Sequence, residues 1–231
     1  MLPPHTTFVE AFAGGCQVLF QKEPSKVEVI NDLDGELINF YRICQNHFEE
    51  LLRYLRFILI SRKWFDLLQH TPPDTLTDVQ RAGRYFFLQK SAFGGLVARQ
   101  NYGIHVVQPP NLKGSRISEL ILKAHERLAN VQIESLPYDQ VLARYDRPST
   151  VFYLDPPYFG VSLYRYNLSK EDFVLLAERL RGLRGKFILS LNDRPEVRQI
   201  FGEFICEPIS LSYSVQRTPG KRYGELIIKN F

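Results

Sequence analysis

Several common signals are missing from this sequence. No apolar run approaches the roughly 20 residues that a membrane-spanning helix needs, and the N-terminus lacks the basic and apolar regions of a secretory signal. Only 3 cysteines occur among the 231 residues. Their number is odd and their spacing is not that of metal ligands. We therefore expect a cytoplasmic protein with reduced thiols, no bound metal and no membrane contact.

Two frequent nucleotide-binding motifs are also absent. The phosphate-binding sequence GK[ST] occurs nowhere, which argues against a P-loop ATPase. The dinucleotide pattern GxGxxG is missing as well, because Gly14 and Gly15 are followed by CQVLF. The commonest ATP and NAD sites are therefore not indicated.

Positive charge is concentrated in the middle of the chain. The net charge is +4, but residues 42–130 hold 13 Lys and Arg against 7 Asp and Glu, whereas the remainder holds 16 against 18. A solvated helical face with surplus cations explains this balance as well as a surface that meets a polyanion such as DNA. Charge alone does not decide between the two.

The order of elements predicts an α/β domain. Residues 8–12 and 26–32 have the composition of strands, a glycine turn and the start of a helix lie between them, and helical spacing follows over 34–48. Further strands are expected at 131–135, 150–154, 186–191, 203–211 and 225–229. With helices between some of them, this pattern predicts a parallel, doubly wound, Rossmann-like sheet made from both ends of the chain.

The middle of the chain has a different pattern. Residues 51–70 and 78–92 are expected to form helices separated by the breaker TPPDT, and an amphipathic helix is expected at 116–130. The glycine-, asparagine- and proline-rich residues 93–115 between them suggest a loop or hairpin. We therefore expect a mainly helical insert at 49–130 within a domain made of 1–48 and 131–231.

The segment VFYLDPPYFG, residues 151–160, carries the most specific chemistry. Two prolines cannot continue a central strand, so Asp155 should lie at the carboxyl end of a strand, where ligands bind in parallel α/β sheets. The Asp155 carboxylate and the Pro156 carbonyl can accept both N–H bonds of an NH2 group such as the exocyclic amine of adenine. Tyr158 can stack on a base that has been flipped out of a duplex. Taken alone, the Asp-Pro-Pro run is more often a plain turn.

The glycine turn and the acid after the second strand suit a nucleoside cofactor. Glycines allow the backbone to approach a ligand, and the following helix offers free N–H groups. An acid at the position of Asp32 commonly accepts hydrogen bonds from ribose hydroxyls. A tight turn, or a helix N-cap within NDLDGE, is the alternative. In this order, and followed by Asp-Pro-Pro-Tyr, the two features indicate S-adenosylmethionine as methyl donor.

The chain resembles the Dam-type class of adenine-N6 DNA methyltransferases, particularly its phage- and prophage-like members. The likeness rests on FVEAFAGGCQVLF, VEVINDLDGELINFYR, SAFGGLVARQNYG, VFYLDPPY, GKFILSLND and the terminal YGELIIKNF. It implies S-adenosyl-L-methionine as cofactor, double-stranded DNA as substrate and a helical target-recognition insert at 49–130. We expect a monomer.

The resemblance also assigns site residues by position. The catalytic residues would be Asp155, Pro156 and Tyr158. The cofactor would lie against Phe12, Gly14, Gly15, Asp32, Tyr138 and Asp155. Contacts with DNA would come from Arg99, Asn101, Lys113 and Arg116. Arg and Asn suit guanine and adenine edges, although loop solvation and turn formation are the alternative for Arg99 and Asn101.

The chain departs from the family pattern at Ala11, where proline is usual, at Pro137, where an acid is common, and at two further places. Cys16 stands where the glycine-turn motif usually ends in glycine, and Met1 falls where an upstream Gly-Gly-Lys segment would normally have ended. We expect the loss of that segment to weaken cofactor binding. Two alternatives therefore remain open, a catalytically inactive DNA-binding remnant and methylation of another planar amine in RNA or in a protein glutamine.

Overall fold

The computed structural model describes residues 2–58, 60–92, 101–103, 114–161, 165–211 and 223–231. The chain divides into two compact units, one formed by Met1–Leu33 with Glu134–Phe231 and the other by Asp34–Ile133. These bounds differ from the predicted 1–48 with 131–231 and 49–130 at residues 34–48, whose helix α2 (Gly35–Asn46) packs against helices of the second unit, and at residues 131–133. The roles assigned to the two domains stay predictions.

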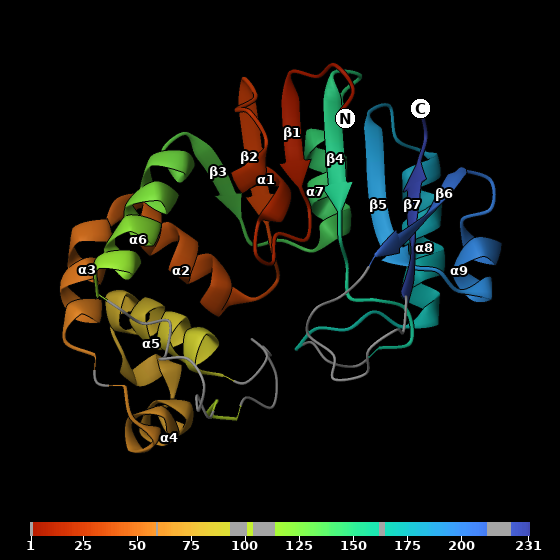
Figure 1. The fold of residues 1–231 in the computed structure, drawn as a ribbon. Coiled ribbons are helices and arrows are strands. Elements are labelled where there is room, and N and C mark those ends of the chain that lie inside the picture. The colour runs from red at the N-terminus through yellow and green to blue at the C-terminus, as the bar shows by residue number, and fades with distance from the viewer. Residues whose placement is uncertain (1, 59, 93–100, 104–113, 162–164, 212–222) are drawn as a thin grey trace. The chain divides into compact units, whose positions relative to one another are not determined.

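Within the described residues, the sheet has seven strands in the order β3-β2-β1-β4-β5-β7-β6 (Figure 1). The strands are β1 (Thr7–Glu10), β2 (Val27–Asn31), β3 (Val131–Glu134), β4 (Thr150–Leu154), β5 (Lys186–Asn192), β6 (Ile205–Leu211) and β7 (Tyr223–Lys229). β1 is parallel to β2 and β4, and β4 is parallel to β5, whereas β7 is antiparallel to both β5 and β6. The predicted Rossmann-like α/β class is confirmed, with an antiparallel β7 that is not part of the prediction.

The core of the first unit explains why its central strands are apolar throughout. Val9 of β1, Phe152 of β4 and Phe187 of β5 are fully buried and belong to one hydrophobic cluster. Residues of the helices α7 (Tyr138–Tyr145), α8 (Lys170–Arg181) and α9 (Pro195–Ile200) complete this cluster. Parallel strands that helices cover on their faces lose the alternation of polar and apolar residues. Helix α7 is not part of the prediction.

The second unit consists of helices. They are α2 (Gly35–Asn46), α3 (Phe48–Arg56), α4 (Arg62–His70), α5 (Asp78–Ser91) and α6 (Gly114–Leu128), with a 3₁₀ turn η1 (Pro73–Thr75). The single helix predicted over 51–70 is wrong, because Ser61 begins a new helix by accepting a hydrogen bond from the Trp64 amide at 3.0 Å. Most of the predicted hairpin over 93–115 lies outside the described residues, but Ala92 and Tyr102 form an antiparallel bridge.

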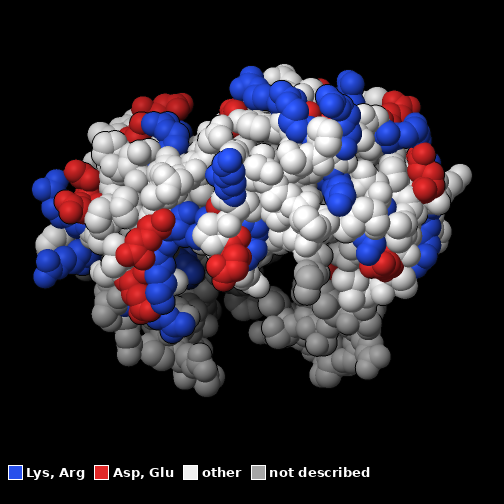
Figure 2. All heavy atoms as spheres, turned by 90° about the horizontal axis from the view of Figure 1, so that it is seen from above, with Lys and Arg blue, Asp and Glu red and all other residues white. Residues whose placement is uncertain are grey.

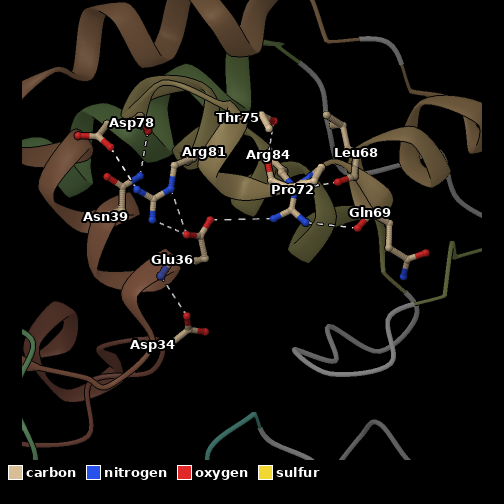
Figure 3. A network of polar contacts seen from close by, with 10 residues as sticks. All are labelled: Asp34, Glu36, Asn39, Leu68, Gln69, Pro72, Thr75, Asp78, Arg81 and Arg84. Atoms are coloured by element: carbon tan, nitrogen blue, oxygen red, sulfur yellow. Dashed lines mark hydrogen bonds and ion pairs between the residues drawn. The ribbon is translucent and has the colours of Figure 1, made fainter.

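A polar network joins α2 to α5 (Figure 3). The Glu36 carboxylate accepts hydrogen bonds from the Arg81 guanidinium, with an Nε–Oε1 distance of 3.1 Å, and lies 4.0 Å from Nη1 of Arg84. Asn39 donates from Nδ2 to the Asp78 carbonyl at 2.9 Å. Two cations of the basic segment 42–130 are thus engaged in holding its own helices together.

The face drawn in Figure 2 carries Lys and Arg side chains interspersed with Asp and Glu. Among the described residues drawn there, no charge of one sign dominates. Within the part of the chain that the structure describes, no helix has the length and apolar character needed to cross a membrane.

Candidate active site at the carboxyl edge of the sheet

Strands β1 and β4 bring the two predicted motifs together. The strands are parallel, with Glu10 opposite Tyr153, and the Ala11 amide still donates to the Tyr153 carbonyl at 3.0 Å. The glycine turn that follows β1 and the Asp-Pro-Pro-Tyr segment that follows β4 therefore leave the sheet as neighbours at the same edge. Figure 1 shows β2, β1 and β4 ending at this edge. Ligands bind at the carboxyl ends of strands in such sheets.

The glycine turn holds two residues in the left-handed region. Gly14 has a φ of 45° and Cys16, which precedes α1 (Gln17–Gln21), has a φ of 49°. The turn is closed by the Cys16 amide, which donates to the Ala13 carbonyl at 2.6 Å. A left-handed φ favours glycine, which explains why the family motif usually has glycine where this chain has Cys16.

Open space lies beside the turn. Among the described residues other than Gly14 and its two neighbours in the chain, no heavy atom lies within 4 Å of the position that a Cβ on Gly14 would occupy. A Cβ on Gly15 would lie 3.0 Å from Nε2 of Gln17. A backbone that is uncovered at Gly14 fits the close approach of a cofactor.

Asp32 and Asn31 tie the loops at this edge to one another. Oδ2 of Asp32 accepts from the Gly14 amide at 3.0 Å. Buried Asn31 donates from Nδ2 to the carbonyls of Ala11 and Leu136, each at 3.0 Å, and accepts from the Leu136 amide at 2.8 Å. The loops that follow β1, β2 and β3 are thereby fixed together. A helix N-cap does lie within NDLDGE, but the capping residue is Asp34 rather than Asp32.

Phe12 and Tyr138 form an aromatic surface near the glycine turn. Their ring centroids are 5.5 Å apart with an interplanar angle of 32°, and both rings are half-buried. Burial raises the pKa of the Tyr138 phenol, with the charges of Asp172 and Asp139 adding to the effect. The Tyr138 hydroxyl therefore stays protonated, and it donates to the Asp172 carbonyl at 3.5 Å.

Glu10 is a buried acid at this edge that the sequence analysis did not select. Its side chain is 2% exposed, and Oε2 accepts from the Leu19 amide at 3.0 Å in α1. Burial raises its pKa to about 7, although hydrogen bonds from the amides of Leu19 and Val18 oppose that rise, and the charge of Asp155 adds to it. A lone acid at the end of an apolar strand was the signal that could have identified it.

Asp155 combines access to solvent with a raised pKa. The residue is exposed on one side, but the protein around the carboxyl group desolvates it enough to raise its pKa to about 6, and the charge of Glu225 adds to the rise. Among the described residues, no hydrogen-bond or ion-pair partner of the Asp155 carboxylate is found. Its oxygens are therefore available as acceptors at the edge of the sheet, while Pro156 is buried behind them.

Two polar side chains hold the residues that follow Asp155. The Tyr158 hydroxyl donates to the carboxylate of Glu225 on β7. Asn192, the last residue of β5, accepts from the Phe159 amide and donates to the Phe159 carbonyl, both at 3.0 Å. The sequence analysis missed Asn192 and Glu225. Their signal was a polar residue at the end of an otherwise apolar strand, which does not reveal what that residue contacts.

The four predicted DNA contacts come from the second unit of the chain. Arg99 and Lys113 lie outside the described residues. Asn101 and Arg116 are described and exposed, Arg116 in the first turn of α6, and both belong to the second unit. Their contact with DNA stays a prediction.

The fold and the site together define a class of protein. The sheet order, the glycine turn after β1, the acid after β2 and the Asp-Pro-Pro-Tyr segment after β4 are those of a Rossmann-like methyltransferase. The family model described as D12 class N6 adenine-specific DNA methyltransferase matches residues 1–213, and the chain belongs to this family. The expectation of an adenine-N6 DNA methyltransferase that uses S-adenosylmethionine is thereby confirmed.

Curated relatives cover nearly the whole chain. Type II methyltransferase M.CviBI of Paramecium bursaria Chlorella virus NC1A is 24% identical over 98% of this chain and 90% of its own length. Type II methyltransferase M1.LlaDCHI of Lactococcus lactis subsp. cremoris is 27% identical over 97% and 86%. The crystal structure of the methyltransferase SMU.472 with SAH matches 84% of this chain and 55% of its own, at 12% identity and a TM-score of 0.34.

Proposed function

We propose that Asp155, Pro156 and Tyr158 hold the N6 amine of an adenine that has been flipped out of duplex DNA. The observation that carries this proposal is the position of the Asp155 carboxylate, which lies open to solvent next to the glycine turn. The carboxylate and the Pro156 carbonyl would accept the two N–H bonds of the amine, and the Tyr158 ring would lie against the base. The two prolines limit the movement of these acceptors because their φ angles are fixed.

We also propose that Phe12, Gly14, Gly15, Asp32 and Tyr138 hold the cofactor. The open space at Gly14 supports a close approach to the turn, and the aromatic surface of Phe12 and Tyr138 suits a flat base. The Asp32 carboxylate, which already accepts from the Gly14 amide, suits ribose hydroxyls. When bound, S-adenosylmethionine supplies an electrophilic methyl group.

The charge state of Asp155 determines what it can do. The adenine amine is a poor nucleophile because its lone pair is delocalised into the ring. When both N–H bonds of the amine donate to fixed acceptors, the lone pair of the nitrogen becomes available for attack on the methyl group. Asp155 must be ionised to act as one of these acceptors. With its pKa raised to about 6, the carboxylate is mostly ionised at neutral pH and can also take up the proton that the amine releases.

Labelled methyl transfer to duplex DNA tests this proposal. We expect Asp155→Ala to lower the rate by about 100-fold or more, the range for loss of a positioned acid–base group. Glu178→Gln, which neutralises an exposed acid on α8, is the matched control and should retain the wild-type rate. Wild-type transfer by Asp155→Ala would overturn the proposal. Label on RNA or protein but not on DNA would favour the other planar amines.

Charge and cysteine chemistry support the form of the substrate and the state of the protein. We infer that a monomer binds double-stranded DNA in the cytoplasm through Arg99, Asn101, Lys113 and Arg116. The positive balance of residues 42–130 supports a polyanionic partner. The free thiols of all three cysteines are in keeping with a reducing compartment.

A further inference from the structure

Two polar residues on neighbouring strands both contact the Asp-Pro-Pro-Tyr segment. Asn192 of β5 and Glu225 of β7 lie directly opposite one another in the antiparallel register. Directly opposed residues project from the same face of a sheet, with their Cβ atoms close together. Asn192 therefore bonds to the backbone of Phe159 from the same face from which Glu225 reaches the hydroxyl of Tyr158.

The contacts of this pair restrain different parts of the segment. The Asn192 amide closes two hydrogen bonds with the amide and carbonyl of Phe159, so it fixes the backbone one residue beyond Tyr158. Glu225 fixes the far end of the Tyr158 side chain. The Val161 amide donates to the Tyr158 carbonyl at 3.0 Å and closes the turn. The Tyr158 ring is thus restrained at its backbone and at its hydroxyl.

Burying the carboxylate of Glu225 costs free energy that packing alone would not require. The residue is 5% exposed. A buried carboxylate costs several kcal/mol unless hydrogen bonds compensate for its lost hydration. Here it accepts from a phenol and places a second negative charge near Asp155. An apolar residue would fill the space without the desolvation cost of a carboxylate, which indicates that Glu225 has a role in the site.

We propose that Asn192 and Glu225 are positioning residues for methyl transfer, Asn192 by fixing the catalytic backbone and Glu225 by fixing the Tyr158 ring and maintaining negative charge beside Asp155. This inference rests on the proposed roles of Asp155 and Tyr158. The charge of Asp155 in turn raises the pKa of Glu10 on β1, so the Asp155 carboxylate lies within electrostatic reach of two acids, one on β7 and one on β1.

Glu225→Gln separates positioning from packing, because glutamine has nearly the same shape and can still accept the Tyr158 hydrogen bond while the charge is lost. We expect kcat to fall about tenfold, because a neutral amide accepts a weaker hydrogen bond from Tyr158 than a carboxylate does, with KM for the methyl donor little changed. The acid limb of the kcat–pH profile should move to lower pH, because the charge of Glu225 raises the pKa of Asp155. A residue with only a structural role would leave that limb in place.

Three companion variants complete the test. Asn192→Ala should lower kcat without moving the acid limb. Tyr158→Phe keeps the ring but removes the hydroxyl donor. In this background, Glu225→Gln should lower kcat by a factor at least about threefold smaller than it does in the wild type, because the effects of substitutions at contacting residues are not additive. Glu207→Gln, an exposed acid of the same hairpin that pairs with Lys229 at 2.7 Å, is the matched control and should keep the wild-type kcat and pH profile.

The outcomes distinguish this inference from the proposed function. Loss of activity in Asp155→Ala, together with wild-type kcat and pH profiles in both Glu225→Gln and Asn192→Ala, would overturn the positioning pair alone. Full activity of Asp155→Ala would overturn the proposed function itself. If Glu225→Gln does not fold, as judged by thermal melting, the test passes to Tyr158→Phe, for which an unchanged kcat would count against the pair.

Discussion

At the scale of single residues, Glu10 links the glycine turn to the stability of the protein. Its carboxyl group is almost completely buried at the end of β1, where it accepts from the Leu19 amide and lies within electrostatic reach of Asp155 and Lys22. Burial opposes ionisation more strongly than these hydrogen bonds and Lys22 favour it. The folded protein therefore retains a proton on Glu10 at pH values where an unfolded chain has lost it.

The stability of the protein should therefore depend on pH through Glu10. Its pKa rises from an ordinary value of 4.5 to about 7 on folding, so the free energy of unfolding should fall as pH increases across this window. The contribution is up to about 3 kcal/mol. Glu10→Gln removes it, so the variant should gain stability relative to wild type as pH rises from 4.5 to 7.

Urea denaturation across this pH range measures the difference between the variant and wild type. Glutamine also changes the hydrogen bond with the Leu19 amide. That change shifts the difference in the free energy of unfolding between variant and wild type by the same amount at every pH, so it does not alter how this difference depends on pH. Glu178→Gln, which changes an exposed acid, should run parallel to wild type at all pH values. Parallel curves for Glu10→Gln would contradict the assignment.

At the scale of elements, most strands and helices could be predicted because the apolar pattern follows local structure. β4 and the ends of β2 and β5 lie within a residue of their predicted positions. The break between α3 and α4 was missed because apolar residues continue through it, while the capping bond of Ser61 is a local detail. The antiparallel direction of β7 depends on tertiary pairing, which periodicity does not contain.

The candidate site divides in the same way. Asp155, Gly14 and Asp32 could be selected because each lies at or just after the end of a predicted strand. Asn192 and Glu225 could not be assigned partners, because they project from the same face only through the register of β5 with β7. A shift of β7 by one residue would turn the Glu225 side chain to the other face. Local sequence thus located the chemical groups but not the contacts that fix them.

The pairing of α2 with α5 should depend on Glu36. Its side chain is 12% exposed and that of its partner Arg81 is 25% exposed. Glu36→Gln leaves two partly buried guanidinium groups, those of Arg81 and Arg84, without their shared anion (Figure 3). We expect a loss of about 1–3 kcal/mol in the free energy of unfolding.

Chemical denaturation of the full chain measures this loss. The matched control is Glu119→Gln, which breaks the ion pair between Glu119 and Lys123 on the exposed surface of α6. An exposed pair of this kind contributes little because solvent screens it. Equal stabilities of the two variants would show that the network in Figure 3 does not hold α2 to α5.

At the scale of the whole molecule, the chain separates two kinds of residue. The first unit contains every predicted catalytic and cofactor residue, all of them on loops after strands or at the start of α7. The helical second unit contains the described candidates for DNA contact, Asn101 and Arg116. Arg81 and Arg84 of the same unit are engaged with Glu36, so its positive balance overstates the cations available to DNA.

The salt dependence of DNA binding tests whether Arg116 meets a phosphate. Each phosphate contact contributes about 0.9 to the slope of log affinity against log salt concentration, because binding releases condensed counterions. Arg116→Ala should therefore make this slope shallower by about one and weaken binding to all duplex sequences alike. Fluorescence anisotropy of a labelled duplex between about 50 and about 200 mM salt measures the slope.

Arg184→Ala is the control for this experiment. Arg184 is exposed and lies just before β5, at the edge of the sheet opposite to Asp155. Its removal changes the net charge by the same amount as Arg116→Ala but should leave the slope at its wild-type value. If both variants shift the slope equally, binding responds to overall charge, and the assignment of Arg116 fails. A shift confined to Arg116→Ala would identify the start of α6 as part of the surface that binds DNA.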